Sequence, residues 1–185
     1  QVPGPVIHAH VGDTLVVRLT NRLPEPTTIH WHGLRLPAPM DGTEDAQRPI
    51  APGETFEYRF MLPDAGTFWY HPHLNETEQL EKGLYGALIV RAADELTLDD
   101  EKVLVFDDLR VDKSGQIAKF GGLMDRHNGR EGNVRLINGT SEPELTIAAG
   151  QIERWRIVNA SSAGYVRVSL GGRPFPKIGS HGHVM

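Results

Sequence analysis

Cysteine is absent from this 185-residue chain, and it has neither a long apolar run nor a cluster of basic residues. Without cysteine the chain can form no disulfide bond, no thiolate nucleophile and no thiolate–metal bond. No apolar run reaches the roughly 20 residues that a membrane-spanning helix needs, so we expect no membrane partner. The net charge is −5, and without a basic cluster we expect no nucleic-acid partner either.

Turn-forming residues divide the chain into short apolar segments, for it contains 20 glycines and 13 prolines. In one of these segments Phe56, Tyr58 and Phe60 alternate with polar residues, and this period of two predicts a half-buried strand. Many short strands between turns are typical of an all-β sandwich or barrel. The predicted strands are 14–21, 55–62, 66–71, 86–91, 102–109, 144–149, 152–159 and 165–170. The one predicted helix lies in 75–86.

Two segments of the chain echo each other. Residues 11–21 align without gaps on 149–159, with a glycine, an arginine and an asparagine identical at matching positions. A turn glycine, a strand and a closing asparagine in both segments indicate two copies of one sandwich unit. Because the chain becomes acidic and polar over 91–102, we expect a first domain at 1–95 and a second at 96–185.

Two histidine pairs stand out: "HWHG" at 30–33 and "YHPH" at 70–73. If both segments are strands or strand ends, the two histidines of each pair point to the same face. Trp31 then points to the opposite face, into the packing. Pro72 cannot donate a ladder hydrogen bond, which places the second pair at a strand end or a sheet edge.

A single pair of this kind is usually no more than two hydrogen-bonded polar side chains. Two pairs in one sandwich favour a metal site. Four imidazoles without a thiolate suit zinc, copper, iron or nickel, and on spacing alone zinc is the default. The spacing leaves open whether the pairs share one ion or serve several.

The segments 27–42 and 66–73 resemble the first two copper motifs of the multicopper oxidases, which are laccase-like enzymes. The resemblance continues through 4–21 and 83–90, and 136–161 is similar to the start of that family's second domain. It implies cupredoxin-like Greek-key β-sandwiches or barrels: one complete unit and a second unit that is cut short.

By this resemblance copper is the cofactor. His30 would bind the type 2 copper, His32 and His71 one type 3 copper, and His73 the other. These residues are half of the ligands of a three-copper cluster that reduces dioxygen to water. Asp41 falls where the family carries an acid that delivers protons to bound oxygen. From the residues alone, Asp41 and Gly42 would simply form a turn.

The family's other four cluster ligands and its type 1 copper site belong to a C-terminal sandwich, and the type 1 site needs a cysteine. We therefore expect this chain to be the N-terminal part of a longer oxidase, inactive alone and completed by its C-terminal portion or by another subunit. The expected partners are dioxygen and a reducing substrate, either phenol-like or a metal ion. The implied location is periplasmic or extracellular.

Two other functions compete with the oxidase. One is a non-catalytic cupredoxin-like protein that binds copper or acts as a scaffold. The other is a mononuclear zinc hydrolase, for which Asp41 is the only candidate for a water-activating acid. A third histidine pair, His181 and His183, lies at the C-terminal end of the sequence, where we expect solvent-facing side chains.

Overall fold

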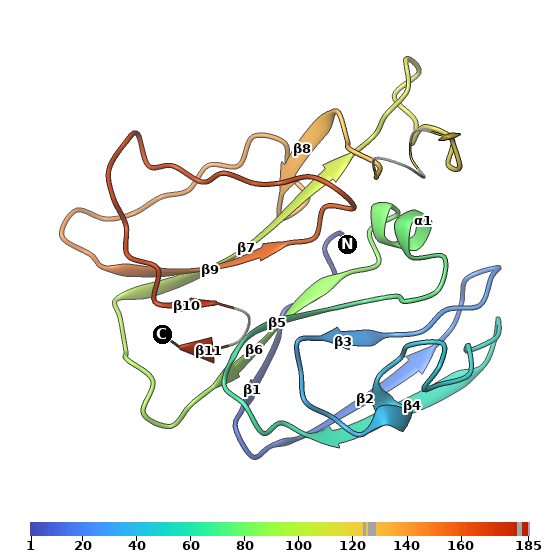
Figure 1. Cartoon of the computed structure of the whole chain (residues 1–185). Coiled ribbons are helices and arrows are strands. Elements are labelled where there is room, and N and C mark those ends of the chain that lie inside the picture. Colours follow the sequence, from blue (N-terminus) through green and yellow to red (C-terminus); the bar gives the residue numbers. More distant parts are fainter. Residues whose placement is uncertain (124, 126–128, 181–182, 185) are drawn as a thin grey trace.

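The computed structural model describes residues 1–123, 125, 129–180 and 183–184, and most of its regular structure is strand (Figure 1). The predicted all-β fold class is thus confirmed. The strands are β1 (Ile7–His10), β2 (Thr14–Thr20), β3 (His30–His32), β4 (Thr55–Met61), β5 (Gly66–His71), β6 (Gly86–Arg91), β7 (Asp100–Leu109), β8 (Val134–Ile137), β9 (Glu153–Asn159), β10 (Gly179–Ser180) and β11 (His183–Val184).

Among the described residues, the named helical elements are a 3-10 turn, η1 (Ala38–Met40), and one short helix, α1 (Glu76–Glu81), and Leu123 and Asp125 are also helical. The helix predicted within 75–86 therefore occupies only the first part of that segment. No helix in the described part of the chain is both long and apolar enough to cross a membrane.

The N-terminal part of the chain folds into two sheets with a core between them. One sheet has the strand order β1-β6-β5-β3, and the other pairs β2 with β4. Every second residue of β2 and β4 faces inward, so Val17 and its register partner Tyr58 both reach the core. Trp31, Phe68 and Leu88 meet them from the four-stranded sheet. This packing fixes the backbones of β3 and β5, which carry the histidine pairs.

The C-terminal part has a single three-stranded sheet, ordered β8-β7-β9, and the small β10–β11 hairpin. The strands predicted at 144–149 and 165–170 are wrong, since neither segment forms a strand. Their apolar residues Leu145, Ile147 and Tyr165 are exposed. A period of two makes a strand only where neighbouring strands and a core complete it, and within the described residues no second sheet covers these side chains.

The echoing segments share their local structure. Each segment has a glycine with positive φ at its second position, +90° at Gly12 and +85° at Gly150. Each then forms a strand and ends at an asparagine, Asn21 or Asn159, whose side-chain oxygen accepts a hydrogen bond from the backbone N–H two residues later. Their pairings differ, because β2 is antiparallel to β4 whereas β9 is parallel to β7. A duplicated sandwich unit, with domains at 1–95 and 96–185, stays a prediction.

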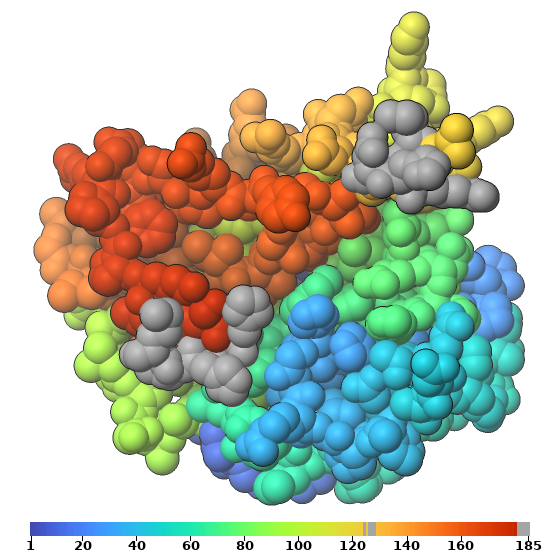
Figure 2. Space-filling model, in the orientation of Figure 1, coloured from blue at the N-terminus to red at the C-terminus, as the bar shows by residue number. Residues whose placement is uncertain are grey.

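The two parts of the chain meet at a second, buried apolar cluster. Figure 2 shows the orange and red segments of the C-terminal part lying against the green region of the N-terminal part. Tyr85, the residue before β6, donates a hydrogen bond of 2.6 Å to Asp107 on β7, so a buried polar contact accompanies the apolar one. The cluster consists of Leu80, Tyr85, Ala87, Val105, Val158 and Ala160.

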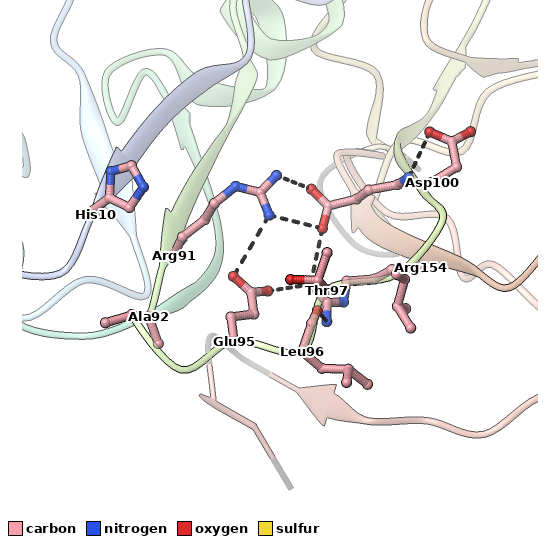
Figure 3. Close-up of a pocket in the computed structure, with 11 residues that line it drawn as sticks. His10, Arg91, Ala92, Glu95, Leu96, Thr97, Asp100 and Arg154 are labelled. Carbon is pink, nitrogen blue, oxygen red and sulfur yellow. Dashed lines mark hydrogen bonds and ion pairs between the residues drawn. The ribbon is translucent and has the colours of Figure 1, made fainter.

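A network of charged side chains connects the linker after β6 to the three-stranded sheet β8-β7-β9 (Figure 3). Glu101 contacts Arg91 at 2.5 Å, Arg154 at 3.2 Å and Arg156 at 2.9 Å. Glu95, in the linker, contacts Arg154 at 2.5 Å and also pairs with Arg156. The network borders an open cavity of about 570 Å³. Three guanidinium groups thus depend on two carboxylates.

We expect the Asp107→Asn substitution to stabilise the chain by about 1–2 kcal/mol at pH 7.5. Burial raises the pKa of Asp107 to about 6, above the value of about 3.9 for an unfolded chain. The protonated form is therefore favoured in the folded state, and stability falls as the pH rises from about 4 through about 6. Asparagine cannot ionise and can still accept the hydrogen bond from Tyr85.

Urea denaturation at pH 4.5, 6.0 and 7.5 measures this effect, with Asp45→Asn as the control at an exposed aspartate. The free energy of unfolding of the Asp107 variant, relative to that of the unmodified chain, should rise from pH 4.5 to pH 7.5, whereas that of the control should not. A difference that is the same at all three pH values would show that the Asp107 carboxyl does not titrate in this way.

Candidate metal centre

The two histidine pairs lie on adjacent antiparallel strands. β3 and β5 pair in the register His30 with His71 and His32 with Trp69, so the two sequence motifs, forty residues apart, are cross-strand neighbours. His30 and His32 lie on one face of β3, and Trp31 lies on the other face with 1% of its surface exposed. This arrangement agrees with the predicted period of two.

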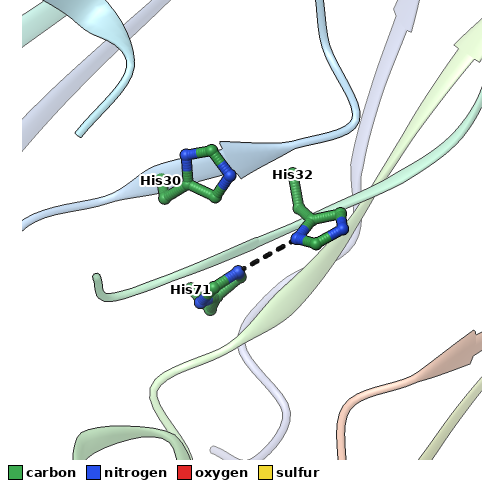
Figure 4. Close-up of side chains that lie close together, drawn as sticks. All are labelled: His30, His32 and His71. Atoms are coloured by element: carbon green, nitrogen blue, oxygen red, sulfur yellow. Dashed lines mark hydrogen bonds between the residues drawn. The ribbon is translucent and has the colours of Figure 1, made fainter. Parts of the chain in front are cut away.

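Three of the four predicted ligands converge. His30, His32 and His71, here called the histidine cluster, each offer one ring nitrogen, and these nitrogens all lie within 4.8 Å of one another. Figure 4 shows the three rings turned toward a common space. Nδ1 of His32 lies 3.3 Å from Nε2 of His71. Two imidazole nitrogens on one metal ion, each at about 2.0–2.1 Å, would be roughly 3–3.4 Å apart.

The fourth predicted ligand, His73, stands beside the cluster. Its ring centroid is 5.3 Å from that of His30 and 6.4 Å from that of His71. Its backbone N–H donates a hydrogen bond of 3.2 Å to the hydroxyl of Thr28, which holds the residue after Pro72 against the strand that leads into β3. His73 is more exposed than His71, and its ring lies on the His30 side of the cluster.

Backbone carbonyls fix the tautomers of two cluster histidines. Nδ1–H of His71 donates to the carbonyl of Pro72 at 2.8 Å, and Nδ1–H of His30 donates to the carbonyl of Asp41 at 2.9 Å. In both rings the proton is on Nδ1, so Nε2 carries the lone pair that can bind a metal ion. In His71 this lone pair accepts the Nδ1 proton of His32, which a bound ion would replace.

The environment keeps His71 neutral. Burial lowers the pKa of His71 to about 4, and the neighbouring His30, His32 and His73 lower it further, although the hydrogen bond to Pro72 opposes them. A metal ion needs the unprotonated imidazole. At neutral pH the His71 ring is already neutral, so it can bind a metal ion without first releasing a proton.

Two residues next to His71 were not predicted from the sequence. The Trp69 ring stacks on the His71 ring, with centroids 4.2 Å apart and planes at 22°, and it also lies 5.1 Å from the His32 ring. Trp69 precedes His71 by two residues, so the period of two could have placed it on the same face. The Glu76 carboxylate lies 3.3 Å from Nδ1 of His71, a contact made by the turn into α1 that no motif signals.

Asp41 lies behind His30. Its carboxylate Oδ2 is 3.5 Å from Nδ1 of His30, so it faces the ring edge away from Nε2. The Asp41 carbonyl makes the shorter contact with the same nitrogen. Asp41 is thus adjacent to the cluster, while its carboxylate lies on the outer side of His30.

Among the described side chains, His8 and His10 do not extend the cluster, and His127 lies outside the described residues. His8 and His10 are exposed on β1. His181 lies outside the described residues, and of His183 only the backbone, in β11, is described. The cavities beside the linker and beside α1 are both lined by residues outside the cluster.

The donor set decides which metal the cluster suits. Neutral imidazoles without thiolates fit copper or zinc, and so does the spacing of the nitrogens. A family model described as "Multicopper oxidase" matches residues 1–95. The chain belongs to the multicopper oxidase family. This family uses copper, and the histidine cluster is compatible with a copper site.

Similar proteins extend the match beyond residue 95. Multicopper oxidase MmcO of Mycobacterium tuberculosis is 36% identical over 92% of this chain and 40% of its own length. Copper resistance protein A homolog of Pseudomonas syringae pv. tomato is 39% identical over 83% of this chain and 26% of its own. A crystal structure of a multi-copper oxidase from Pseudomonas thermotolerans aligns with a TM-score of 0.83 and 40% identity, covering 87% of this chain and 40% of that one.

The chain thus spans 40% or less of the length of these proteins. It carries two histidine pairs on adjacent strands and, without cysteine, cannot form a cysteine-ligated type 1 copper site.

Proposed function

We propose that this chain supplies half of the ligands of the three-copper cluster in an oxidase that couples oxidation of a reducing substrate to the reduction of dioxygen to water. The observation that carries the proposal is the convergence of His30, His32 and His71 within 4.8 Å in a chain of this family. Copper bound there would supply the electron-transfer chemistry, passing electrons one at a time to dioxygen.

Each histidine has a proposed ion. His32 and His71 would share one type 3 copper, because the 3.3 Å between Nδ1 of His32 and Nε2 of His71 suits two ligands of one ion. The ion would replace the proton that His32 donates in this contact, and that proton would move to Nε2 of His32. His30 would bind the type 2 copper through Nε2, the nitrogen that its contact with the Asp41 carbonyl leaves free. His73, whose ring lies nearer to His30 than to His71, would bind the second type 3 copper.

Asp41 has the proposed role of holding a proton near the type 2 site. Its carboxylate is partly exposed and lies 3.5 Å from Nδ1 of His30, so it can exchange protons with solvent. Because it faces the outer edge of the ring, a water molecule would have to relay the proton to the oxygen side of the site.

The proposed oxidase needs further components. The other half of the cluster ligands and an entry point for electrons would come from a C-terminal portion of a longer protein or from another subunit. The reductant would be phenol-like or a metal ion, and we propose a periplasmic or extracellular location. The similarity to a protein named for copper resistance supports a setting where copper is handled.

Neither competing function gains support from the site. A zinc hydrolase needs an acid beside the ligand side of the metal, whereas the Asp41 carboxylate lies on the Nδ1 side of His30. A copper-free scaffold would have no need of three imidazoles with converging nitrogens.

Copper titration of the metal-free chain, followed by electron paramagnetic resonance, tests the proposal. We expect bound Cu(II) with hyperfine coupling to imidazole nitrogens, and retention of copper in the presence of equimolar zinc. Stoichiometric zinc with no copper would favour the hydrolase. If no metal binds under copper-replete conditions, the result would favour the copper-free scaffold protein.

A further inference from the structure

The turn that follows η1 packs directly against the strand that carries His30. The Asp41 N–H donates to the Ala38 carbonyl at 3.0 Å, which closes the 3-10 turn, and Gly42 then adopts a φ of +81°. A side chain at position 42 would have no room. Its Cβ would lie 1.9 Å from the carbonyl oxygen of Ile29 and 2.8 Å from the backbone nitrogen of His30.

This close approach puts the Asp41 carbonyl within 2.9 Å of Nδ1 of His30. A second contact fixes the turn from its other side, where the Arg59 N–H of β4 points to the Met40 sulfur at 3.4 Å. The carbonyl holds the His30 proton on Nδ1, so Nε2 is the nitrogen offered to the cluster. The Asp41 carboxylate, at 3.5 Å, is the weaker of the two contacts.

We propose that Gly42 is a positioning residue for His30: its missing side chain lets the Asp41 carbonyl approach Nδ1 and select the tautomer that binds metal through Nε2. This inference rests on the proposed role of His30 as a copper ligand. It separates two functions of one residue, because the Asp41 main chain orients His30 while the Asp41 side chain handles protons.

The test compares Gly42→Ala with Gly53→Ala. Gly53 has nearly the same φ, +82°, but a Cβ added to it would meet no atom within 4 Å. Both variants therefore bear the cost of alanine in a left-handed conformation, and only the first displaces the turn. We expect Gly42→Ala to weaken Cu(II) binding by the metal-free chain about 10- to 100-fold. Gly53→Ala should stay within about twofold of the unmodified chain. Equal affinities in the two variants would overturn the proposal.

Imidazole nitrogen-15 NMR of the unmodified, metal-free chain gives a second readout that does not depend on whether Gly42→Ala folds. We expect His30 to carry its proton on Nδ1, and Asp41→Asn, which retains the carbonyl, to leave that tautomer unchanged. A proton on Nε2 of His30 would overturn the proposal. A chain that binds no copper but shows the Nδ1 tautomer would refute the proposed function and uphold the positioning role.

Discussion

His71→Ala is expected to lower the copper affinity of the chain by at least about 100-fold, more than the roughly 10- to 100-fold cost of losing an outer-shell partner. His71 is the most buried member of the histidine cluster, with 3% of its side chain exposed. Its Nε2 lies next to Nδ1 of His32, and its ring centroid is 5.4 Å from that of His30. Its loss removes the buried ring beside both other members of the cluster and leaves His30 and His32, with His73 at the side of His30.

Competition with a chromophoric chelator measures this affinity, and His10→Ala is the matched control. His10 lies on β1 with 70% of its side chain exposed, so its removal should change the affinity by less than about twofold. His71 also stacks on Trp69, and alanine would leave a cavity there. His71→Gln, which restores most of the volume, should bind copper no better than His71→Ala. Copper binding by either variant at the level of the control would remove His71 from the site.

The sequence was sufficient to predict the faces of the two strands at the site. A period of two put His30 and His32 together and Trp31 in the core, and the structure agrees. The relation between the two pairs needed more, because spacing within a strand says nothing about which strand lies next to it. The resemblance to the copper motifs bridged that gap, since it joined segments forty residues apart into one site.

Contacts made by backbone atoms were beyond prediction from the sequence. The carbonyls of Pro72 and Asp41 orient two histidines, yet any residue has a carbonyl, so no residue type marks the role. The strand predicted at 144–149 was wrong because the sequence does not show whether a neighbouring strand and a core are present. Its alternation is as regular as that of 55–62, but β4 has β2 beside it and a core beneath it, whereas Leu145 and Ile147 are exposed.

Glu101→Gln is expected to destabilise the chain by about 2–3 kcal/mol, between the cost of breaking a surface ion pair and that of breaking a buried one, because the charge network is partly buried. Glu101 contacts Arg91, Arg154 and Arg156, and only 17% of its side chain is exposed. Glutamine would leave three guanidinium groups to share Glu95. Because these residues connect the linker to β7 and β9, the loss should loosen the junction first, while β2 and β4 persist.

Denaturant unfolding measures the change, with Glu57→Gln as the control. Glu57 pairs with Arg18 on the surface, with 35% and 74% of their side chains exposed, and such pairs contribute about 0–1 kcal/mol. The pH dependence separates charge from packing. Burial raises the pKa of Glu101, but the guanidinium groups of Arg91 and Arg156 outweigh it and leave the pKa lowered. The stability from Glu101 is therefore complete above the pKa of an unfolded glutamate and is lost as the pH falls toward the lowered value. The gap between the unmodified chain and Glu101→Gln should narrow in acid, whereas a gap that is constant with pH would mean that packing, and not charge, holds the junction.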